Sequence, residues 1–269
     1  DLANDKDLLQ LNETATKLMA HQWHAAPLGK EIVEDTSAVA ENIINPANHN
    51  DVVGTVIEAT SAQVDAALNT AANAQSDWIN TDKDARAGCL LRAADIMESR
   101  LQELMVLLSR ESGKTYANAI AEVREAVDFL RYYASQIVDL DKNANIEALG
   151  TVLCISPWNF PLAIFSGQIA AALVAGNTVI AKPAEQTPLI AAEAIRILWL
   201  AGVPQSVVQL VPGRGETVGS QLSQDDRIKG IMFTGSTEVA KILQKTVANR
   251  LSKNGTPIPL IAETGGQNA

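Results

Sequence analysis

The side chains best suited to chemistry stand where short apolar runs of the sequence end. Asn159 follows the run TVLCIS and lies within PWNFP, residues 157–161, where two prolines stiffen the turn. A rigid amide at this place can donate a hydrogen bond to an oxyanion that develops on a substrate. The alternative is a turn asparagine whose side chain satisfies the local backbone.

A carboxylate follows the last apolar run. Glu263 comes after PIPLIA and before two glycines. In that apolar setting we expect the carboxylate to be desolvated and therefore suited to act as a general base. The alternative is a strand-end glutamate whose carboxylate reaches solvent.

Two further charged residues follow the run TVIA. Lys182 and Glu185 belong to KPAEQTP. A carboxylate at the end of a strand can accept hydrogen bonds from ribose hydroxyls, and it repels a 2′-phosphate, which favours NAD over NADP. The alternative is an exposed ion pair in a loop.

Two glycine-containing segments follow the remaining runs. GRGETVG holds Gly213, Gly215 and Gly219, whose last gap is one residue longer than in the dinucleotide fingerprint. These glycines still let the backbone approach a ligand closely. TGST, residues 234–237, leads into a predicted helix, where free N–H groups and hydroxyls suit a pyrophosphate. An ordinary N-cap is the alternative for Ser236.

The cysteines and histidines are not predicted to carry chemistry. Cys89 and Cys154 have apolar neighbours and no adjacent cation that would activate a thiol, so we interpret both as packing residues. The three histidines lack metal-ligand spacing, and no metal site is predicted.

The elements that position these residues follow from apolar runs that alternate with helical stretches. Pro161 can open the first of these helices, Thr187 and Pro188 begin the second, and Thr237 to Ser252 form the third. This alternation is typical of an α/β fold with a doubly wound, Rossmann-like parallel sheet. Ligands bind at the carboxyl ends of the strands in such a sheet, which is where the polar segments lie. The predicted strands are TVLCIS, TVIAKP, VVQLVP, GIMFTG and PIPLIAE.

The pattern of apolar residues before the predicted sheet indicates mainly helices. Thr60 and Gln63 have the spacing of a capping box, and a second helix is predicted from Leu90 through Leu108 to an end near Gly113. We assign residues 1–136 to a helical portion that packs on the sheet, 137–150 to a polar loop or short hairpin, and 151–269 to the Rossmann-like core.

Composition excludes several classes of partner. The 269 residues are 47% hydrophobic and carry a net charge of -10, which argues against nucleic acid or an anionic membrane as partner. The chain holds no apolar run of about 20 residues that could span a membrane. Two unpaired cysteines and the absence of a signal peptide favour a cytoplasmic location.

In their order, PWNFP, KPAEQTP, GRGETVG, FTGS and ETGG resemble the aldehyde dehydrogenase superfamily over residues 151–269, and more weakly upstream. GTVLCISPWNFPLAIF and ETGGQNA resemble most its glutamate-semialdehyde (Δ1-pyrroline-5-carboxylate) dehydrogenase branch, which acts in proline catabolism. The resemblance implies NAD as cofactor and a cysteine nucleophile. It assigns Asn159 to the oxyanion and Glu263 to the general base. For the cofactor it assigns Trp158, Lys182, Glu185, Gly213, Gly219, Phe233 and Ser236.

The nucleophilic cysteine of the family lies downstream of the glutamate, in a second, catalytic domain. Neither Cys89 nor Cys154 occupies a matching position. We therefore expect residues 1–269 to be an incomplete NAD-binding domain that cannot turn over alone, within a parent that oxidises L-glutamate γ-semialdehyde. The alternatives are another semialdehyde dehydrogenase, or a non-catalytic dinucleotide-binding module. We expect the parent to be a homo-oligomer. The sequence leaves open whether the parent is fused to a proline dehydrogenase.

Overall fold

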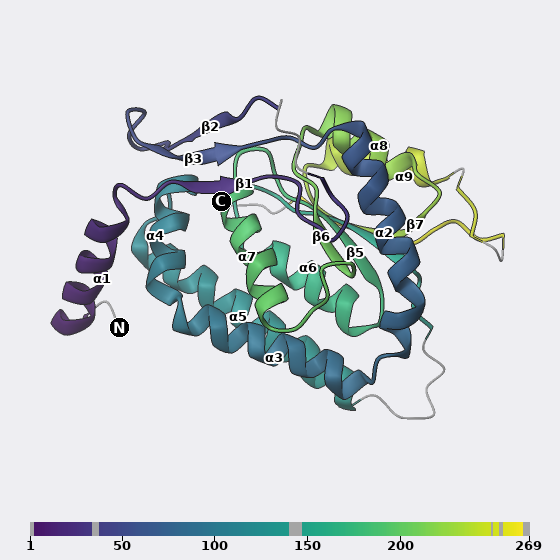
Figure 1. Ribbon diagram of the computed structural model, residues 1–269, viewed down its shortest axis with the longest axis horizontal. Helices are drawn as coiled ribbons and strands as arrows, with labels where there is room; N and C mark the ends of the chain where they lie inside the picture. The colour runs from purple at the N-terminus through teal and green to yellow at the C-terminus, as the bar shows by residue number, and fades with distance from the viewer. Residues whose placement is uncertain (1–2, 34–37, 140–146, 249, 253–254, 266–269) are drawn as a thin grey trace.

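A five-stranded, all-parallel sheet organises the computed structural model, which describes residues 3–33, 38–139, 147–248, 250–252 and 255–265. The strand order is β6-β5-β4-β7-β8 (Figure 1). The five apolar runs of the sequence form these strands, so the predicted doubly wound sheet is confirmed. The strands are β4 (Thr151–Ile155), β5 (Thr178–Lys182), β6 (Val208–Leu210), β7 (Ile228–Gly235) and β8 (Leu260–Thr264).

Helices cover both faces of the sheet. Val152 and Cys154 of β4 pack into one hydrophobic layer and Leu153 into the other, as the two-residue period of a strand requires. The strand order reverses between β4 and β7, which is the point where such sheets open a ligand crevice. The first layer is formed by α6 (Ala163–Val174) and α7 (Pro188–Leu200), and the second by α2 (Ser61–Asn80), α8 (Ser220–Gln224) and α9 (Thr237–Ala248).

A further helical layer lies outside α6 and α7, where α3 and α5 run side by side (Figure 1). The helix predicted from Leu90 to Leu108 is wrong as a single element, because its backbone leaves helical geometry at Arg100. Sequence periodicity does not reveal this break, since the apolar spacing continues across it. Gly113, with φ of 70°, ends α4 as predicted. The layer consists of α3 (Lys83–Ser99), α4 (Leu101–Ser112) and α5 (Tyr116–Asp139).

The helical portion also contains a small sheet that was not predicted from the sequence. Its order is β1-β3-β2, with β1 (Trp23–Ala25) parallel to β3 (Val52–Val56) and β2 (Glu41–Ile44) antiparallel to it. These strands are too short for their alternation of apolar residues to be recognised. The remaining helix, α1 (Asp5–Leu18), precedes the sheet.

Several predicted boundaries shift. The capping box at Thr60 and Gln63 forms and begins α2, which packs directly on the large sheet. The helix expected to reach Ser252 ends at Ala248. Within the segment 137–150, α5 continues to Asp139, and residues 140–146 lie outside the described part of the chain.

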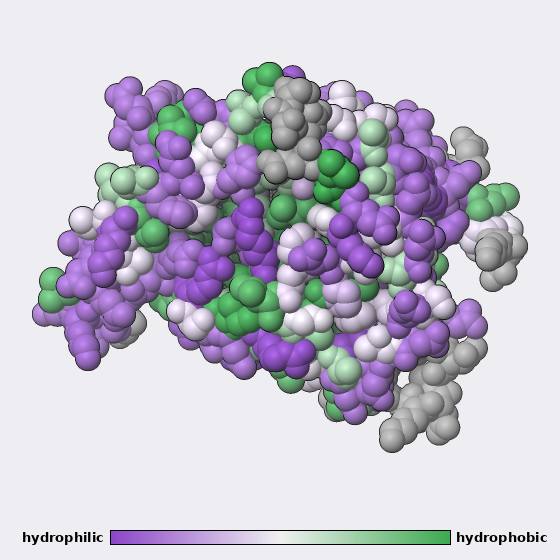
Figure 2. Space-filling model, in the orientation of Figure 1, coloured by the Kyte–Doolittle hydropathy of each residue, from purple (hydrophilic) through white to green (hydrophobic). Residues whose placement is uncertain are grey.

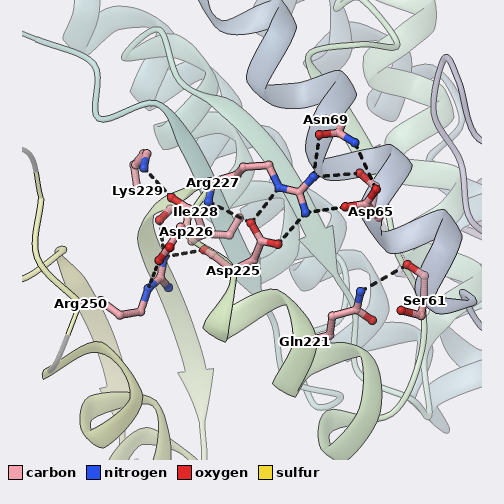
Figure 3. Close-up of polar contacts among 10 residues, drawn as sticks. All are labelled: Ser61, Asp65, Asn69, Gln221, Asp225, Asp226, Arg227, Ile228, Lys229 and Arg250. Carbon is pink, nitrogen blue, oxygen red and sulfur yellow. Dashed lines mark hydrogen bonds and ion pairs between the residues drawn. The ribbon is translucent and has the colours of Figure 1, made fainter.

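The start of β7 is anchored by two arginines (Figure 3). The Arg227 guanidinium lies 2.6 Å from Asp225 Oδ2 and 2.7 Å from Asp65 Oδ1 of α2, and it donates to Asn69 Oδ1. Arg250 donates to the carbonyls of Ser223 and Ile228. These contacts join α2, the turn after α8 and β7.

The surface in the view of Figure 2 is mostly hydrophilic, with small apolar groups between the polar side chains. No helix in the described residues combines the length and apolar character needed to cross a bilayer.

Candidate active site

The predicted site residues lie at the end of the large sheet where the carboxyl ends of its strands stand side by side. This end is called the edge of the sheet, and β8 is called its edge strand. In the parallel register, Ile155 of β4 pairs with Lys182 on one side and with Phe233 on the other. Thr234 of β7 pairs in turn with Glu263 of β8. Because all five strands point the same way, the segments that follow them emerge together. The sheet thus collects residues that are far apart in the sequence.

A cleft of about 390 Å³ lies at this edge beside β5 and β6. That volume lies in the range of small-ligand sites. Glu185 and Gly213, both predicted cofactor residues, line it directly. The lining residues are Glu41, Ile43, Val56, Glu58, Ala184, Glu185, Pro188, Pro212, Gly213, Arg214 and Glu216.

Lys182 lies buried beside this cleft, with 4% of its surface exposed. Burial lowers the pKa of Lys182, while the carboxylates of Glu185, Glu58 and Glu216 act in the opposite direction. Its ammonium donates to the carbonyl of Pro183 at 3.2 Å, which leaves further donor capacity. The alternative from the sequence was an exposed ion pair between Lys182 and Glu185. The structure does not show this pair, because Lys182 is buried.

Glu185 is exposed and joins two strand-end segments. Its Oε1 accepts a hydrogen bond from the Gly215 N–H at 2.7 Å. The second carboxylate oxygen stands at the cleft, where it can accept a hydrogen bond from a hydroxyl group.

Two glycines allow the close packing at the cleft. Gly213 has φ of 153°, and a Cβ there would lie 2.4 Å from Val218 Cγ2. A Cβ on Gly219 would lie 3.3 Å from Lys182 Cε. Side chains at these positions would displace Val218 or Lys182, so both glycines are part of the cleft's construction.

The segment 157–161 lies at the switch point after β4. The backbone N–H of Ser156 donates to the carbonyl of Lys182, which ties this segment to β5. Trp158 and Asn159 are both exposed. In the described chain no protein group accepts or donates a hydrogen bond at the Asn159 amide. The amide is therefore available to an external acceptor.

A second, smaller pocket of about 100 Å³ holds Phe233 and Glu263. Gln168 of α6 donates to Thr234 Oγ1 at 3.0 Å, and Thr234 Oγ1 lies 3.5 Å from Glu263 Oε2. Gln168 Oε1 is buried without a hydrogen-bond partner. Asn159 follows β4 and Glu263 lies within β8, and these two strands flank β7.

Glu263 is exposed, so the expectation that it follows a buried strand and is desolvated is wrong for this structure. The physical reason is that β8 is the edge strand of the sheet, and no described element pairs with its outer side. The alternative interpretation, a strand-end glutamate that reaches solvent, describes its environment here.

The structure shows Ser236 in its alternative role, an ordinary N-cap. Its hydroxyl accepts a hydrogen bond from the Val239 N–H at 3.2 Å, which is an N-cap interaction at the start of α9. This bond orients the first turn of α9 toward the same edge of the sheet.

The two cysteines are buried as expected, but the expectation that Cys89 has no adjacent cation is wrong, because Arg92 donates a hydrogen bond to Cys89 Sγ at 3.2 Å. Both are buried, and burial raises the pKa of each thiol. Cys154 lies inside β4 between Ala181 and Met232, and its side chain belongs to the layer of α6 and α7. Neither thiol is placed beside Glu263. Within the described ranges, no cluster of three or more histidine, cysteine or acidic residues could hold a metal ion.

Sequence reasoning missed one wall of the cleft. Glu41 and Glu58, from the β2–β3 hairpin and the residues after it, line the cleft opposite Arg214, with which they form ion pairs at 3.7 and 3.5 Å. The Ala59 N–H donates to the Pro212 carbonyl and fixes this contact. No local signal could have revealed it. Gln168 was also missed, although a polar residue in the apolar helix AIFSGQIAAALV was a detectable signal.

The residues present are suited to a dinucleotide. The cleft is lined by the carboxylate of Glu185 and by residues of the segment 213–219, and the buried cation Lys182 lies beside it. A carboxylate and an ammonium group at this place can form hydrogen bonds with the ribose hydroxyls of such a ligand.

A model of the aldehyde dehydrogenase family matches residues 32–269. Bifunctional protein PutA from Escherichia coli (strain K12) is 57% identical over 269 residues, covering 100% of this chain and 20% of that protein. 1-Pyrroline-5-carboxylate dehydrogenase from Anoxybacillus flavithermus (strain DSM 21510 / WK1) is 35% identical, covering 99% of this chain and 53% of that protein.

A solved structure shows the same fold. The crystal structure of 1-pyrroline-5-carboxylate dehydrogenase from Thermus with bound NAD superposes with a TM-score of 0.87 at 34% identity, covering 98% of this chain and 54% of that one. The chain thus spans a fifth to about half of the length of these relatives.

Proposed function

Because the chain belongs to the aldehyde dehydrogenase family, we propose that it is the NAD-binding part of a longer enzyme that oxidises L-glutamate γ-semialdehyde to L-glutamate. The observation that carries this proposal is the arrangement of Lys182, Asn159 and Glu263 along the carboxyl ends of β5, β4 and β8, with Glu185 in the adjacent cleft. The names of the relatives, which include PutA and 1-pyrroline-5-carboxylate dehydrogenases, support the substrate.

Asn159 and Glu263 have separate roles in this proposal. The Asn159 amide donates a hydrogen bond to the aldehyde oxygen as negative charge develops there during nucleophilic attack. Glu263 accepts a proton from the water that releases the product as a carboxylic acid. Its exposure is consistent with this role, since water must reach the carboxylate.

The cofactor residues bind and orient NAD, which supplies the hydride acceptor when bound. Lys182 and Glu185 hold the ribose hydroxyls nearest the adenine, and Gly213 and Gly219 permit the close approach of that end. Ser236 and the first turn of α9 face the pyrophosphate. Trp158 and Phe233 border the cofactor on either side of the β4–β7 switch point.

In this proposal, the nucleophilic cysteine belongs to a part of the parent enzyme outside this chain. Cys89 and Cys154 are buried and have raised pKa values, so they are poor nucleophiles. Residues 1–269 would then be an NAD-binding domain with a helical portion (1–136), a polar segment (137–150) and a Rossmann-like core (151–269). We also propose that the parent is a cytoplasmic homo-oligomer fused to a proline dehydrogenase. The word "bifunctional" in the name of the PutA relatives supports a second enzymatic unit.

The test uses the longer protein that contains this chain. NADH formation is followed with glutamate γ-semialdehyde and with succinate semialdehyde, and the kcat/KM values are compared. A clear preference for glutamate γ-semialdehyde is expected. A preference for succinate semialdehyde assigns another substrate, and NAD binding without oxidation of either aldehyde assigns a non-catalytic module. NADH formation by residues 1–269 alone would contradict the placement of the nucleophile.

A further inference from the structure

A buried glutamate caps the helix that follows the Asn159 segment. Glu122 of α5 is 1% exposed. Its Oε1 accepts hydrogen bonds from the backbone N–H of Leu162 at 2.8 Å and, more weakly, of Ala163 at 3.4 Å. No side chain at the start of α6 itself provides a cap. The first turn of α6 is therefore held from the helical layer.

Lys114 extends this contact to Phe160, which lies between Asn159 and the capped residues Leu162 and Ala163. Its ammonium lies 2.8 Å from Glu122 Oε2 and 4.4 Å from the centre of the Phe160 ring. Phe160 follows Asn159 directly, and Leu162 comes two residues later. Because no described protein group bonds to the Asn159 amide, its direction depends on the backbone that Lys114 and Glu122 hold.

A second buried glutamate caps α7, the helix that follows the segment after β5. Glu111 of α4 is 4% exposed, and its two oxygens accept hydrogen bonds from the N–H groups of Leu189 at 2.6 Å and Ile190 at 2.9 Å. Thr187 stands at the N-cap of α7, but its hydroxyl is buried without a hydrogen-bond partner. The cap of α7 thus also comes from the helical layer.

These two caps are costly for the fold, since a buried carboxylate loses its hydration. A serine, threonine or asparagine at the N-cap would satisfy the same N–H groups without burying a carboxyl group. The carboxylates instead connect α4 and α5 to the first turns of α7 and α6. Those turns begin where the segments 157–161 and 182–187 end, and Pro188 itself lines the cleft.

We propose that Glu122, with Lys114, is a positioning residue for the Asn159 segment, and that Glu111 is a positioning residue for the Lys182–Glu185 segment. The proposal rests on the proposed function. It predicts that the two glutamates affect different steps, since one holds the oxyanion donor and the other holds the cofactor-binding residues.

The test compares Glu122→Gln, Lys114→Met and Glu111→Gln in the longer protein that contains this chain. Two quantities are measured for each: kcat/KM for the aldehyde at saturating NAD, and the Kd of NAD from tryptophan fluorescence. A displacement near 1 Å at a reacting group lowers the rate by about 100-fold, so the Glu122 and Lys114 variants should lose about 10- to 100-fold in kcat/KM with an unchanged Kd. Glu111→Gln should raise the Kd of NAD about tenfold, as loss of one hydrogen bond to a backbone N–H does.

Glu193→Gln is the matched control. Glu193 is likewise a largely buried glutamate, on α7, and it pairs with Arg100 and Arg196 away from both segments. Both measured quantities should stay near those of the unchanged protein. Equal losses of both quantities in all variants, including the control, would mean that the glutamates are merely structural. Unchanged values in the Glu122 and Glu111 variants would also overturn the proposal.

Amide hydrogen exchange separates this proposal from the proposed function. Glu122→Gln should speed exchange at Leu162 and Ala163, and Glu111→Gln should speed it at Leu189 and Ile190, whether or not the protein oxidises an aldehyde. If the unchanged protein is inactive on every semialdehyde, the proposed function fails, while local exchange and the Kd of NAD still test the positioning. Unaltered exchange at all four amides contradicts it. Lys114→Met serves in place of a Glu122 variant that does not fold.

Discussion

Thr234 and Glu263 stand side by side in the parallel pairing of β7 and β8, with the threonine hydroxyl 3.5 Å from the glutamate carboxylate. Only this pairing with β7 holds Glu263 among the described residues, because β8 is the edge strand of the sheet. Asn159 lies at the carboxyl ends of the same strands, and the segment that carries it is held by Glu122, which caps the start of α6. The two supports are connected through α6, because Gln168 donates both to the Ile155 carbonyl at the end of β4 and to Thr234 Oγ1.

The proposed role of Glu263 as the base that acts on water predicts the effect of Glu263→Gln in the longer protein. Loss of a general base lowers turnover by about 10²- to 10⁴-fold. Because the base acts on water after hydride transfer, a first burst of NADH should remain. Stopped-flow measurement of NADH absorbance checks this. Loss of the burst together with the steady-state rate would place Glu263 at an earlier step.

Glu185→Gln should relax the choice between NAD and NADP. The substitution removes the charge that opposes a 2′-phosphate and keeps an oxygen for the Gly215 N–H. Repulsion between two close charges near a protein surface amounts to up to about 4 kcal/mol, so the ratio of kcat/KM for NADP to that for NAD should rise at least about tenfold. Steady-state kinetics with both cofactors measure this ratio. An unchanged ratio means that the carboxylate does not face the 2′ position.

Arg227→Ala should destabilise the fold without touching the site. The guanidinium joins the turn before β7 to Asp65 and Asn69 of α2 (Figure 3). We expect the free energy of unfolding to fall by about 1–3 kcal/mol. Urea titration of the 269-residue chain measures the change. The control is Arg131→Ala, because Arg131 pairs with acidic residues on an exposed surface, where such pairs contribute less than about 1 kcal/mol. Equal effects of both substitutions would contradict the anchoring role.

Glu111 should make the fold less stable as the pH rises. Burial raises the pKa of Glu111 to about 8, although two backbone N–H groups act in the opposite direction. Between the ordinary glutamate value and about 8, the folded chain holds a proton that the unfolded chain has released. The free energy of unfolding should therefore fall with rising pH across this window, by up to about 1.4 kcal/mol per pH unit, and level off above it.

Urea unfolding of the chain at several pH values between about 5 and 8 measures this slope. Glu111→Gln cannot ionise and should remove that part of the slope. The same slope in both proteins would show that another group is responsible.

Much of the site could be predicted from the sequence because its signals are local. Apolar runs bounded by proline, glycine and charged residues located all five strands of the large sheet, and strand direction then implied that Asn159, Lys182 and Glu263 share an edge. The capping box at Thr60 and the end of α4 at Gly113 were equally local. Each depends on the conformational preferences of a few adjacent residues.

Only the tertiary structure decided the rest. Glu263 is exposed because β8 is the edge strand of the sheet, which an apolar run cannot reveal. Glu58 lines the cleft because the β2–β3 hairpin folds over the end of β6, and Glu111 and Glu122 cap α7 and α6 across helix interfaces. These contacts join residues whose local sequence carries no mark of their partners. The amino-acid order thus determined which residues follow the strands, while packing between distant segments decided which of them are buried, capped or open to water.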